Sequence, residues 1–324
     1  MKKILTFGII GLMMVVCSFA QAQTLTWTAG GVGGGWYTIA GGISNIVNEK
    51  SGGITVKVIP GGGTVNPRLV DKGDCELGWG LPFLNVAAWN GEDPYDKKHS
   101  NLRAIAGGMS LNFFHFYVAA DSQIKTMDEV FKQKKALRMA ISPTGTSDEW
   151  VFRKVLAHYK LDYKDLEAAG FKFFRGSYAE QASQFKDRNV DSVFTFLALP
   201  GAAITEASIG RSLRLIDFSP EALKSLLQYG IESAKIPAGT YAKAANANVD
   251  VTTAIAGSVI LVNKSVSEDM AYRIAKVIHE NLDQFRKIHA SLAPYQLKDA
   301  VTGLGLIPLH PGAEKYYKEK GVLK

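Results

Sequence analysis

The sequence predicts an α/β protein of two lobes that are joined by two strands crossing between them. Short strand-like segments are repeatedly followed by small-residue turns and amphipathic helices, which is the pattern of a parallel sheet. Two longer extended stretches, residues 113–119 and 252–262, enclose a second block of this pattern. If both stretches cross, lobe one consists of residues 23–118 and 251–324, and lobe two of residues 119–250.

The first 22 residues (1–22) have the features of a secretory signal peptide. Lys2 and Lys3 precede the apolar run 4–16, and residues 20–22 read Ala-Gln-Ala, an A-x-A cleavage pattern. We therefore expect a periplasmic protein whose mature chain begins at Gln23. An uncleaved membrane anchor is the alternative, which the polar sequence after the A-x-A site disfavours.

Cysteine content and charge narrow the possible functions. Cys17 lacks the small residues that precede a lipidated cysteine, and its removal with the signal leaves only Cys75, so no intramolecular disulfide can form. Loss of Lys2 and Lys3 lowers the formal charge of +7 by two. The basic residues are scattered, so we expect no nucleic-acid partner, while a mild positive balance suits an anionic solute.

A glycine-rich turn, residues 30–37, joins the first expected strand to the first helix. Its sequence is Gly-Gly-Val-Gly-Gly-Gly-Trp-Tyr. A dinucleotide fingerprint does not fit, because Trp36 stands where the third glycine belongs, and the chain contains no P-loop sequence. Two interpretations remain: a flexible turn near the mature N-terminus, or a first ligand-binding turn in which Gly35 exposes backbone and Trp36 and Tyr37 form a pocket wall.

The remaining elements follow from periodicity and turn residues. Strands are expected at residues 25–28, 54–59, 75–79, 102–106, 113–119, 137–141, 172–174, 192–196, 214–216 and 252–262. Helices are expected at residues 39–47, 64–73, 83–90, 127–132, 146–159, 177–186, 200–207, 220–228, 267–282, 297–302 and 311–320. N-caps are expected from Thr64, from Thr146 with Glu149, from Ser177 with Glu180, and from Ser265 with Glu268.

Seven motifs in a fixed order give the mature chain a family resemblance. They are residues 30–37, Gly62-Gly63-Thr64-Val65-Asn66, Gly73-Asp74-Cys75-Glu76-Leu77, residues 142–146, Tyr178-Ala179-Glu180-Gln181 with Val190-Asp191-Ser192-Val193-Phe194, Ile236-Pro237-Ala238-Gly239-Thr240-Tyr241, and Ile307-Pro308-Leu309-His310-Pro311-Gly312-Ala313 with Tyr316-Tyr317. Together they resemble the TAXI family of TRAP-transporter solute-binding receptors. The resemblance implies a type II periplasmic-binding-protein fold with a ligand cleft between the lobes.

The resemblance also implies a function. Such a receptor captures a small anionic organic solute, such as a dicarboxylate, a keto acid or a glutamate-like amino acid, and delivers it to TRAP-type membrane permease subunits. Leu81-Pro82 departs from the polar Ser-Asp of many members, which favours a ligand without an amine. Thr64 replaces the usual serine but keeps its hydroxyl, and Pro67 removes a backbone N–H after Asn66. We expect a monomer without cofactor or metal.

The candidate ligand-binding residues lie on the turns that would line the cleft. They are Gly35, Trp36, Tyr37, Gly63, Thr64, Asn66, Leu81, Phe83, Thr144, Gly145, Thr146, Arg175 and Phe196. Each has a purely structural alternative. The threonines are expected as helix caps, and the two alternatives are capping alone or capping together with binding of a ligand carboxylate. The aromatic residues and Leu81 also fit a core, and Asn66 and Arg175 also fit the surface.

Two other classes of function are the alternatives: an enzyme and a ligand-sensing protein. An enzyme is not expected, because the six histidines show no metal-ligand spacing, no G-x-S-x-G sequence occurs and Cys75 lies in a strand. We therefore name no catalytic residue. The other alternative is a periplasmic ligand-sensing protein that signals to a membrane sensor kinase, and the sequence does not separate it from a transport receptor.

Overall fold

A computed structural model describes residues 23–31 and 34–324. The expected signal peptide lies outside the described residues, and so do Val32 and Gly33 of the glycine-rich turn. Among the helices of the described residues, none has both the length and the apolar character needed to cross a membrane.

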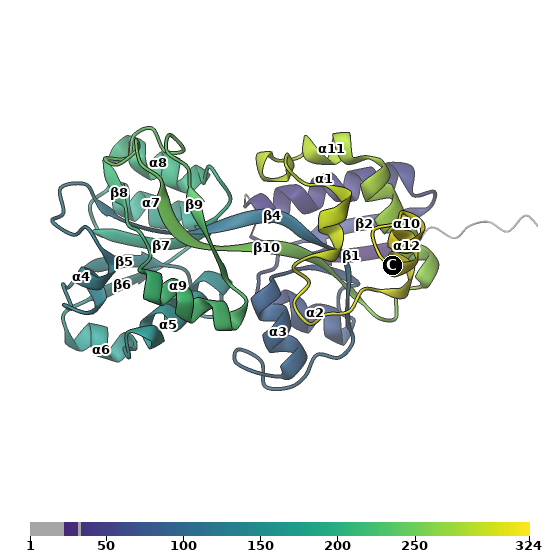
Figure 1. Ribbon diagram of the computed structural model, residues 1–324, viewed down its shortest axis with the longest axis horizontal. Coiled ribbons are helices and arrows are strands. Elements are labelled where there is room, and N and C mark those ends of the chain that lie inside the picture. Colours follow the sequence, from purple (N-terminus) through teal and green to yellow (C-terminus); the bar gives the residue numbers. More distant parts are fainter. Residues whose placement is uncertain (1–22, 32–33) are drawn as a thin grey trace, which may run out of the picture.

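The described strands form one ten-stranded sheet that runs through both lobes (Figure 1). Its main path has the order β2-β1-β3-β10-β4-β7-β5-β6, and β8 and β9 pair with β4 and β10. The strands are β1 (Gln23–Thr28), β2 (Ile54–Ile59), β3 (Leu77–Gly80), β4 (Leu102–Ala119), β5 (Arg138–Ile141), β6 (Lys172–Arg175), β7 (Ser192–Leu197), β8 (Leu213–Leu215), β9 (Glu232–Ile236) and β10 (Val251–Asn263).

Helices cover both faces of this sheet in each lobe. Lobe one contains α1 (Gly35–Lys50), α2 (Asn66–Lys72), α3 (Pro82–Asn90), α10 (Glu268–Glu280), α11 (Leu282–Arg286), α12 (Pro311–Glu319) and the 3-10 helices η2 (Ala290–Leu292) and η3 (Leu297–Val301). Lobe two contains α4 (Met127–Phe131), α5 (Ser147–His158), α6 (Tyr163–Ala168), α7 (Tyr178–Lys186), α8 (Ala202–Gly210), α9 (Pro220–Leu226) and the 3-10 helix η1 (Leu227–Tyr229). The expected fold class, two α/β lobes joined by two crossing strands, is confirmed.

The crossing strands β4 and β10 belong to both lobes. In lobe one β10 pairs with β3, in lobe two β4 pairs with β7, and the two crossing strands pair with each other. The expected break between residues 102–106 and 113–119 is wrong, because one continuous strand of 18 residues spans both segments. Residues 107–112, which separate the two expected strands, belong to this same strand.

The middle of this strand pair is irregular. Gly108 and Ser110 have positive φ angles of 61° and 43°, and the pairing register of β10 shifts between Ala256 and Ser258. Gly107 is required for close packing, since a Cβ atom there would lie 2.1 Å from the carbonyl oxygen of Thr302. Within the described residues, β4 and β10 are the strands that join the lobes, and a bulged, glycine-containing region in them is the natural place for a hinge.

Several expected helix caps are wrong. Thr64 and Thr146 precede α2 and α5, but neither hydroxyl caps its helix. The Thr146 hydroxyl donates to the carbonyl of Pro143 instead, at 2.8 Å. Ser267, rather than Ser265, caps α10. The expected capping box of Ser177 and Glu180 is confirmed.

Several elements escaped the sequence prediction, among them α6, α11, η2 and β9. The six-residue helix α6 carries only one buried residue, so its periodicity is too short to detect. Strand β9 pairs only with the lobe-two end of β10, and its polar sequence lacks a strand signature.

Candidate functional site: the contact between the lobes

The turns that follow the parallel strands of the two lobes meet at the interlobe contact. Strands β1, β2 and β3 are mutually parallel in lobe one, as are β5, β6 and β7 in lobe two. The turn after β2 contacts the turn after β5: the Thr64 hydroxyl donates to the carbonyl oxygen of Gly145. A Cβ atom at Gly63 would lie 2.8 Å from the Cβ of Ser147, so only glycine allows this approach.

Asn66 holds the lobe-one turns in place. Its buried amide donates to the carbonyls of Ala29 and Trp79 at 2.7 and 2.9 Å. Its Oδ1 accepts from the Gly62 N–H at 2.8 Å and from the Thr28 hydroxyl at 2.9 Å. Both amide hydrogens and the oxygen are therefore used to tie three turns together, and in this structure Asn66 positions the site rather than facing a ligand.

Trp36 ties the glycine-rich turn to the hinge region. Its indole N–H donates to the Ser258 hydroxyl of β10 at 2.8 Å, and its ring stacks on Trp79 with centroids 5.9 Å apart. The amide of Asn112 on β4 reaches the same Ser258 hydroxyl at 3.4 Å. Because Ser258 and Asn112 lie on the crossing strands, these hydrogen bonds link the start of α1 to both strands that join the lobes.

The neighbours of Trp36 differ in their surroundings. Gly35 begins α1 and faces the His289 imidazole, whose Nε2 would lie 3.7 Å from a Cβ atom at that position. Tyr37 is partly buried and packs against the lobe-one core. The sequence predicted a pocket wall here, and the structure brings Trp36, but not Tyr37, to the crossing strands.

The lobe-two turn contains Thr144, Gly145 and Thr146. Gly145 has a positive φ of 88°, which favours glycine, and its N–H lies 3.4 Å from Glu149. Glu149 and its neighbour Asp148 occupy the first turn of α5 with buried side chains. Burial raises the pKa of Asp148, opposed by hydrogen bonds from groups that include Ser142.

The start of α5 is thus already compensated by carboxylates of the chain itself. By contrast, α1 carries no acidic residue in its first turn. Negative charge is stabilised at helix N-termini, so the lobe-one side of the contact is the better place for an anion. Of the two threonines expected to bind a ligand carboxylate, Thr64 lies on this side of the contact and Thr146 does not.

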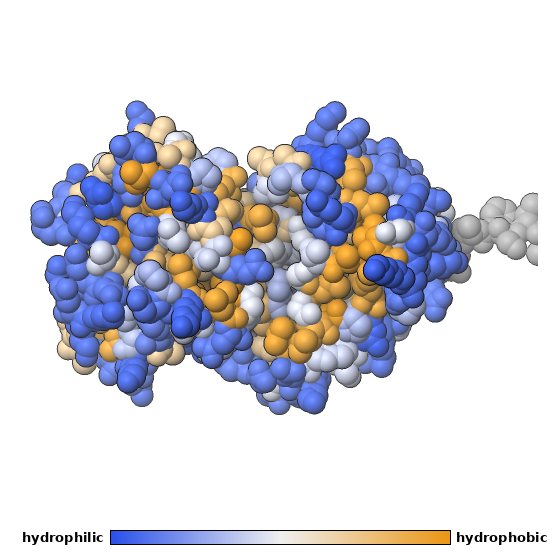
Figure 2. Space-filling view, viewed as in Figure 1, coloured by the Kyte–Doolittle hydropathy of each residue, from blue (hydrophilic) through white to orange (hydrophobic). Residues whose placement is uncertain are grey.

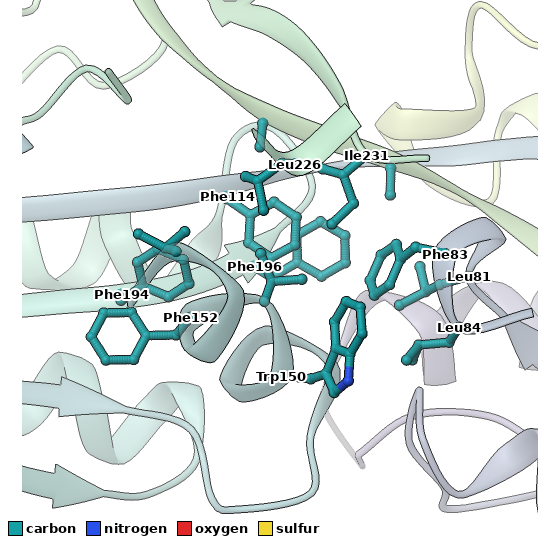
Figure 3. Close-up of a cluster of buried hydrophobic side chains, with 14 of the residues drawn as sticks. Leu81, Phe83, Leu84, Phe114, Trp150, Phe152, Phe194, Phe196, Leu226 and Ile231 are labelled. Atoms are coloured by element: carbon teal, nitrogen blue, oxygen red, sulfur yellow. The ribbon is translucent and has the colours of Figure 1, made fainter. Parts of the chain in front are cut away.

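An apolar cluster joins the lobes beside these turns (Figure 3). Phe83 of α3 stacks on Trp150 of α5, with ring centroids 5.4 Å apart. Phe196 at the end of β7 stacks on Phe114 of β4 at 4.0 Å, and Leu81 is fully buried in the same cluster. Phe83, Phe196 and Leu81 were expected to face a ligand; here Phe83 and Phe196 stack on other aromatic rings, and Leu81 is buried in the same cluster.

Arg175, the expected carboxylate clamp, lies apart from this cluster. Its guanidinium carbon is 4.5 Å from the centroid of the Tyr163 ring, and the residue is exposed. Tyr163 in turn donates to the buried Glu149 at 2.9 Å. The structure therefore places Arg175 next to the start of α5, without contact to the lobe-one turns.

A cavity of about 120 Å³ lies between the lobes at the outer edge of the contact. Aromatic and charged side chains surround it; its lining is Phe83, Val86, Ala87, Glu92 and Asp93 from lobe one, with Trp150, Lys154, Gln228 and Tyr229 from lobe two. Figure 2 shows the waist between the lobes, with hydrophobic residues gathered toward it and hydrophilic residues over the outer surfaces.

Sequence analysis missed most of the residues that join the lobes. Asp93 follows α3 in a loop without a distinctive pattern, and Trp150 and Lys154 looked like ordinary helix residues. A signal existed for Ser258 alone, since Gly257 and Ser258 interrupt the apolar run of a crossing strand. Within residues 23–31 and 34–324, histidine, cysteine and carboxylate side chains form no group that could hold a metal ion.

The fold and the interlobe contact define a class of protein, the two-lobed periplasmic-binding-protein fold. Three solved structures share it: the periplasmic binding protein BugD, MatC from Rhodopseudomonas palustris with bound malate, and PhnD1 from Prochlorococcus marinus in complex with methylphosphonate. Their TM-scores are 0.55, 0.53 and 0.52, at 10%, 13% and 13% identity. The alignments cover 93%, 94% and 94% of this chain and 98%, 99% and 100% of the other chains.

Within this class, residues 27–321 match the model of the NMT1-like family. The match spans nearly all of the described chain, and the protein belongs to this family.

Proposed function

We propose that this protein is an extracytoplasmic receptor that binds a small anionic organic solute between its lobes and delivers it to a membrane permease. The observation that carries the proposal is the direct contact of Thr64 with Gly145. Two turns at the ends of parallel strands, one from each lobe, meet there, and in the part of the chain that the structure describes β4 and β10 are the strands that cross between the lobes. Ligands of open α/β sheets bind at such strand ends.

Membership of the NMT1-like family and the two-lobed fold support a binding role. Two of the similar structures hold small anions, malate and methylphosphonate. The hinge at Gly107–Ser110 would allow the lobes to separate, admit the solute and close again.

The charges around the contact favour a specific orientation of the solute. We place its carboxylate against the lobe-one turns, where α1 begins without an acidic residue. The lobe-two turn would contribute hydrogen bonds through Thr144, Gly145 and Thr146, because Asp148 and Glu149 already compensate the start of α5. Dicarboxylates and keto acids fit this arrangement, and a glutamate-like amino acid remains within the proposal.

The finer assignment is a TAXI-type receptor of a TRAP transporter located in the periplasm. It rests on the ordered motifs from residues 30–37 to Tyr317 and on the signal-peptide pattern of residues 1–22. A gene for a fused TRAP-type permease beside the gene of this protein is expected. A neighbouring sensor-kinase gene would favour the sensing function instead.

A thermal-shift screen tests the binding proposal directly. The chain beginning at Gln23 is refolded to remove carried-over ligand and heated with dicarboxylates, keto acids, amino acids, and neutral sugars as a control. A ligand at about 100 times its Kd stabilises a protein by about 2.7 kcal/mol, so at least one acid should raise the melting temperature by several degrees. No shift with any small acid would contradict the proposal.

A further inference from the structure

Asp93 of lobe one is surrounded by three donors from one helix of lobe two. Its Oδ2 accepts from the Lys154 ammonium at 2.8 Å, from the Trp150 indole N–H at 3.0 Å and from the Arg153 guanidinium at 3.3 Å. Trp150, Arg153 and Lys154 all belong to α5. A single carboxylate therefore joins the loop after α3 to the other lobe.

Aromatic rings support this ion pair on the lobe-two side. The Lys154 ammonium lies 4.5 Å from the centroid of the Trp150 ring and 5.3 Å from that of Tyr229, within the range of cation–π attraction. Phe83 of lobe one covers the opposite part of Trp150 by stacking. The Lys154 side chain is only 17% exposed, which reduces screening of its charge, whereas Asp93 is 52% exposed.

The charge state of Asp93 fits this arrangement. Burial raises the pKa of Asp93, but hydrogen bonds from Lys154 and Trp150 and the positive charges of Arg153 and Lys154 outweigh it, and the net pKa is lowered. The carboxylate is therefore ionised at neutral pH. Arg153 is shared with Glu149 of its own helix, which leaves Lys154 as the principal cationic partner of Asp93.

We propose that Asp93, Trp150 and Lys154 form a latch that holds the two lobes together in the absence of a solute. The latch lies at the edge of the interlobe cavity and is separate from the Thr64–Gly145 contact. It goes beyond the proposed function, since it acts on the free protein. Because ionic attraction of partly exposed groups is screened by salt, the latch makes the closed fraction of the free protein depend on ionic strength.

The latch also has a consequence for uptake of a solute. A protein that is closed without its solute must open before binding, so the apparent affinity falls in proportion to the open fraction. Weakening the latch raises the open fraction and speeds association. The latch thereby favours the closed form of the free receptor, and the free energy of opening lowers the apparent affinity for the solute.

Electron–electron distance measurements on the ligand-free protein test the latch. Spin labels at Lys97→Cys in lobe one and Lys164→Cys in lobe two report the separation of the lobes, since both positions are exposed and the native Cys75 is buried. Raising NaCl from 20 to 500 mM shortens the screening length from about 20 Å to about 4 Å. The higher salt is expected to populate longer distances between the labels. Asp93→Asn and Lys154→Gln are expected to lower the closed-to-open ratio about three- to tenfold and to remove most of the salt dependence.

A matched control is available within lobe two. Lys132 pairs with Asp128 and its ammonium lies 6.0 Å from the Tyr159 ring, so it has the same kinds of partners as Lys154 but none in lobe one. Lys132→Gln should leave the interlobe distances and their salt dependence unchanged. Salt-independent distances in the parent protein, or an Asp93→Asn distribution identical to that of the parent, would overturn the latch. Because no solute is present, either result is independent of the proposed function.

Discussion

The Thr64 hydroxyl of lobe one donates its hydrogen bond to the Gly145 carbonyl of lobe two, although Thr64 stands where a helix cap was expected. Thr64 is 2% exposed, and α2 begins two residues later, at Asn66, with Val65 as its N-cap. The Thr64 hydroxyl contacts the other lobe and does not cap α2. It therefore stabilises the closed arrangement. Its removal therefore reports on closure rather than on helix stability.

Thr64→Val should weaken closure and solute binding. Valine has nearly the same shape, so the change removes the interlobe hydrogen bond at a cost of about 0.5–1.5 kcal/mol, or about two- to twelvefold in affinity. Calorimetric titration with the best acid of the thermal-shift screen measures the effect. Thr240→Val is the matched control, since that hydroxyl donates to the carbonyl of Pro237 within its own turn and Thr240 is not among the residues proposed to bind the solute. Equal affinities of both variants and the parent would show that neither hydroxyl contributes.

Asn66→Ala should destabilise the folded protein strongly. It removes both donors and the acceptor that serve Ala29, Trp79, Gly62 and Thr28, and leaves buried groups unpaired. We expect a loss of about 2–4 kcal/mol in urea unfolding.

The control for this change is Asn90→Ala, whose exposed amide donates only to Glu92. That variant should change the free energy of unfolding by less than about 0.5 kcal/mol. A loss at Asn66 no larger than that at Asn90 would contradict the positioning role of Asn66.

Gly107→Ala should distort the hinge, whereas Gly257→Ala should be tolerated. A Cβ atom at Gly107 would lie 2.1 Å from the backbone oxygen of Thr302, so the segment after η3 has to move, at an expected cost of about 1–3 kcal/mol. At Gly257 the nearest atom is 3.6 Å away, which is ordinary contact. Thermal unfolding of both variants measures the difference. A Gly107→Ala protein as stable as the parent would mean that the contact between η3 and β4 is adaptable.

Mild acid should destabilise the protein through its buried histidines. Burial lowers the pKa of His115 to about 3 and that of His279 to about 4, from the ordinary value of 6.5. Between pH 6.5 and these values the unfolded chain binds protons that the folded chain does not, so stability falls as the pH falls. Each histidine contributes a slope of up to about 1.4 kcal/mol per pH unit.

Urea unfolding between pH 7 and 5 isolates the contribution of His115. His115→Gln should flatten the pH dependence of the unfolding free energy, because one proton-binding group is lost from the unfolded state. Tyr241→Phe removes the hydroxyl that lies 2.9 Å from His115 Nε2 but keeps the imidazole buried, so its slope should match that of the parent. An unchanged slope in His115→Gln would refute the assignment.

Most of the architecture was predictable because its signals are local. Alternation marked β2, small-residue turns marked the strand ends, and the two long apolar stretches indicated that the chain crosses and returns. The same locality explains the errors. Residues 102–106 and 113–119 were expected as two strands because a sequence does not show that β10 pairs along both, and Thr64 looked like a cap because its partner Gly145 is 81 residues away.

The candidate site, too, was predictable from the sequence only in part. The sequence by itself determined the two-lobed plan, the turns that face the contact and most of the residue types on them, since strand ends and helix starts follow from local periodicity. Only the tertiary structure decided that Asn66 uses its hydrogen bonds to hold the turns, that Phe83 stacks on Trp150, and that Asp93 pairs with Lys154. Those roles depend on which distant groups compete for the same hydrogen bonds and apolar surface, and that competition exists only once the two lobes are in contact.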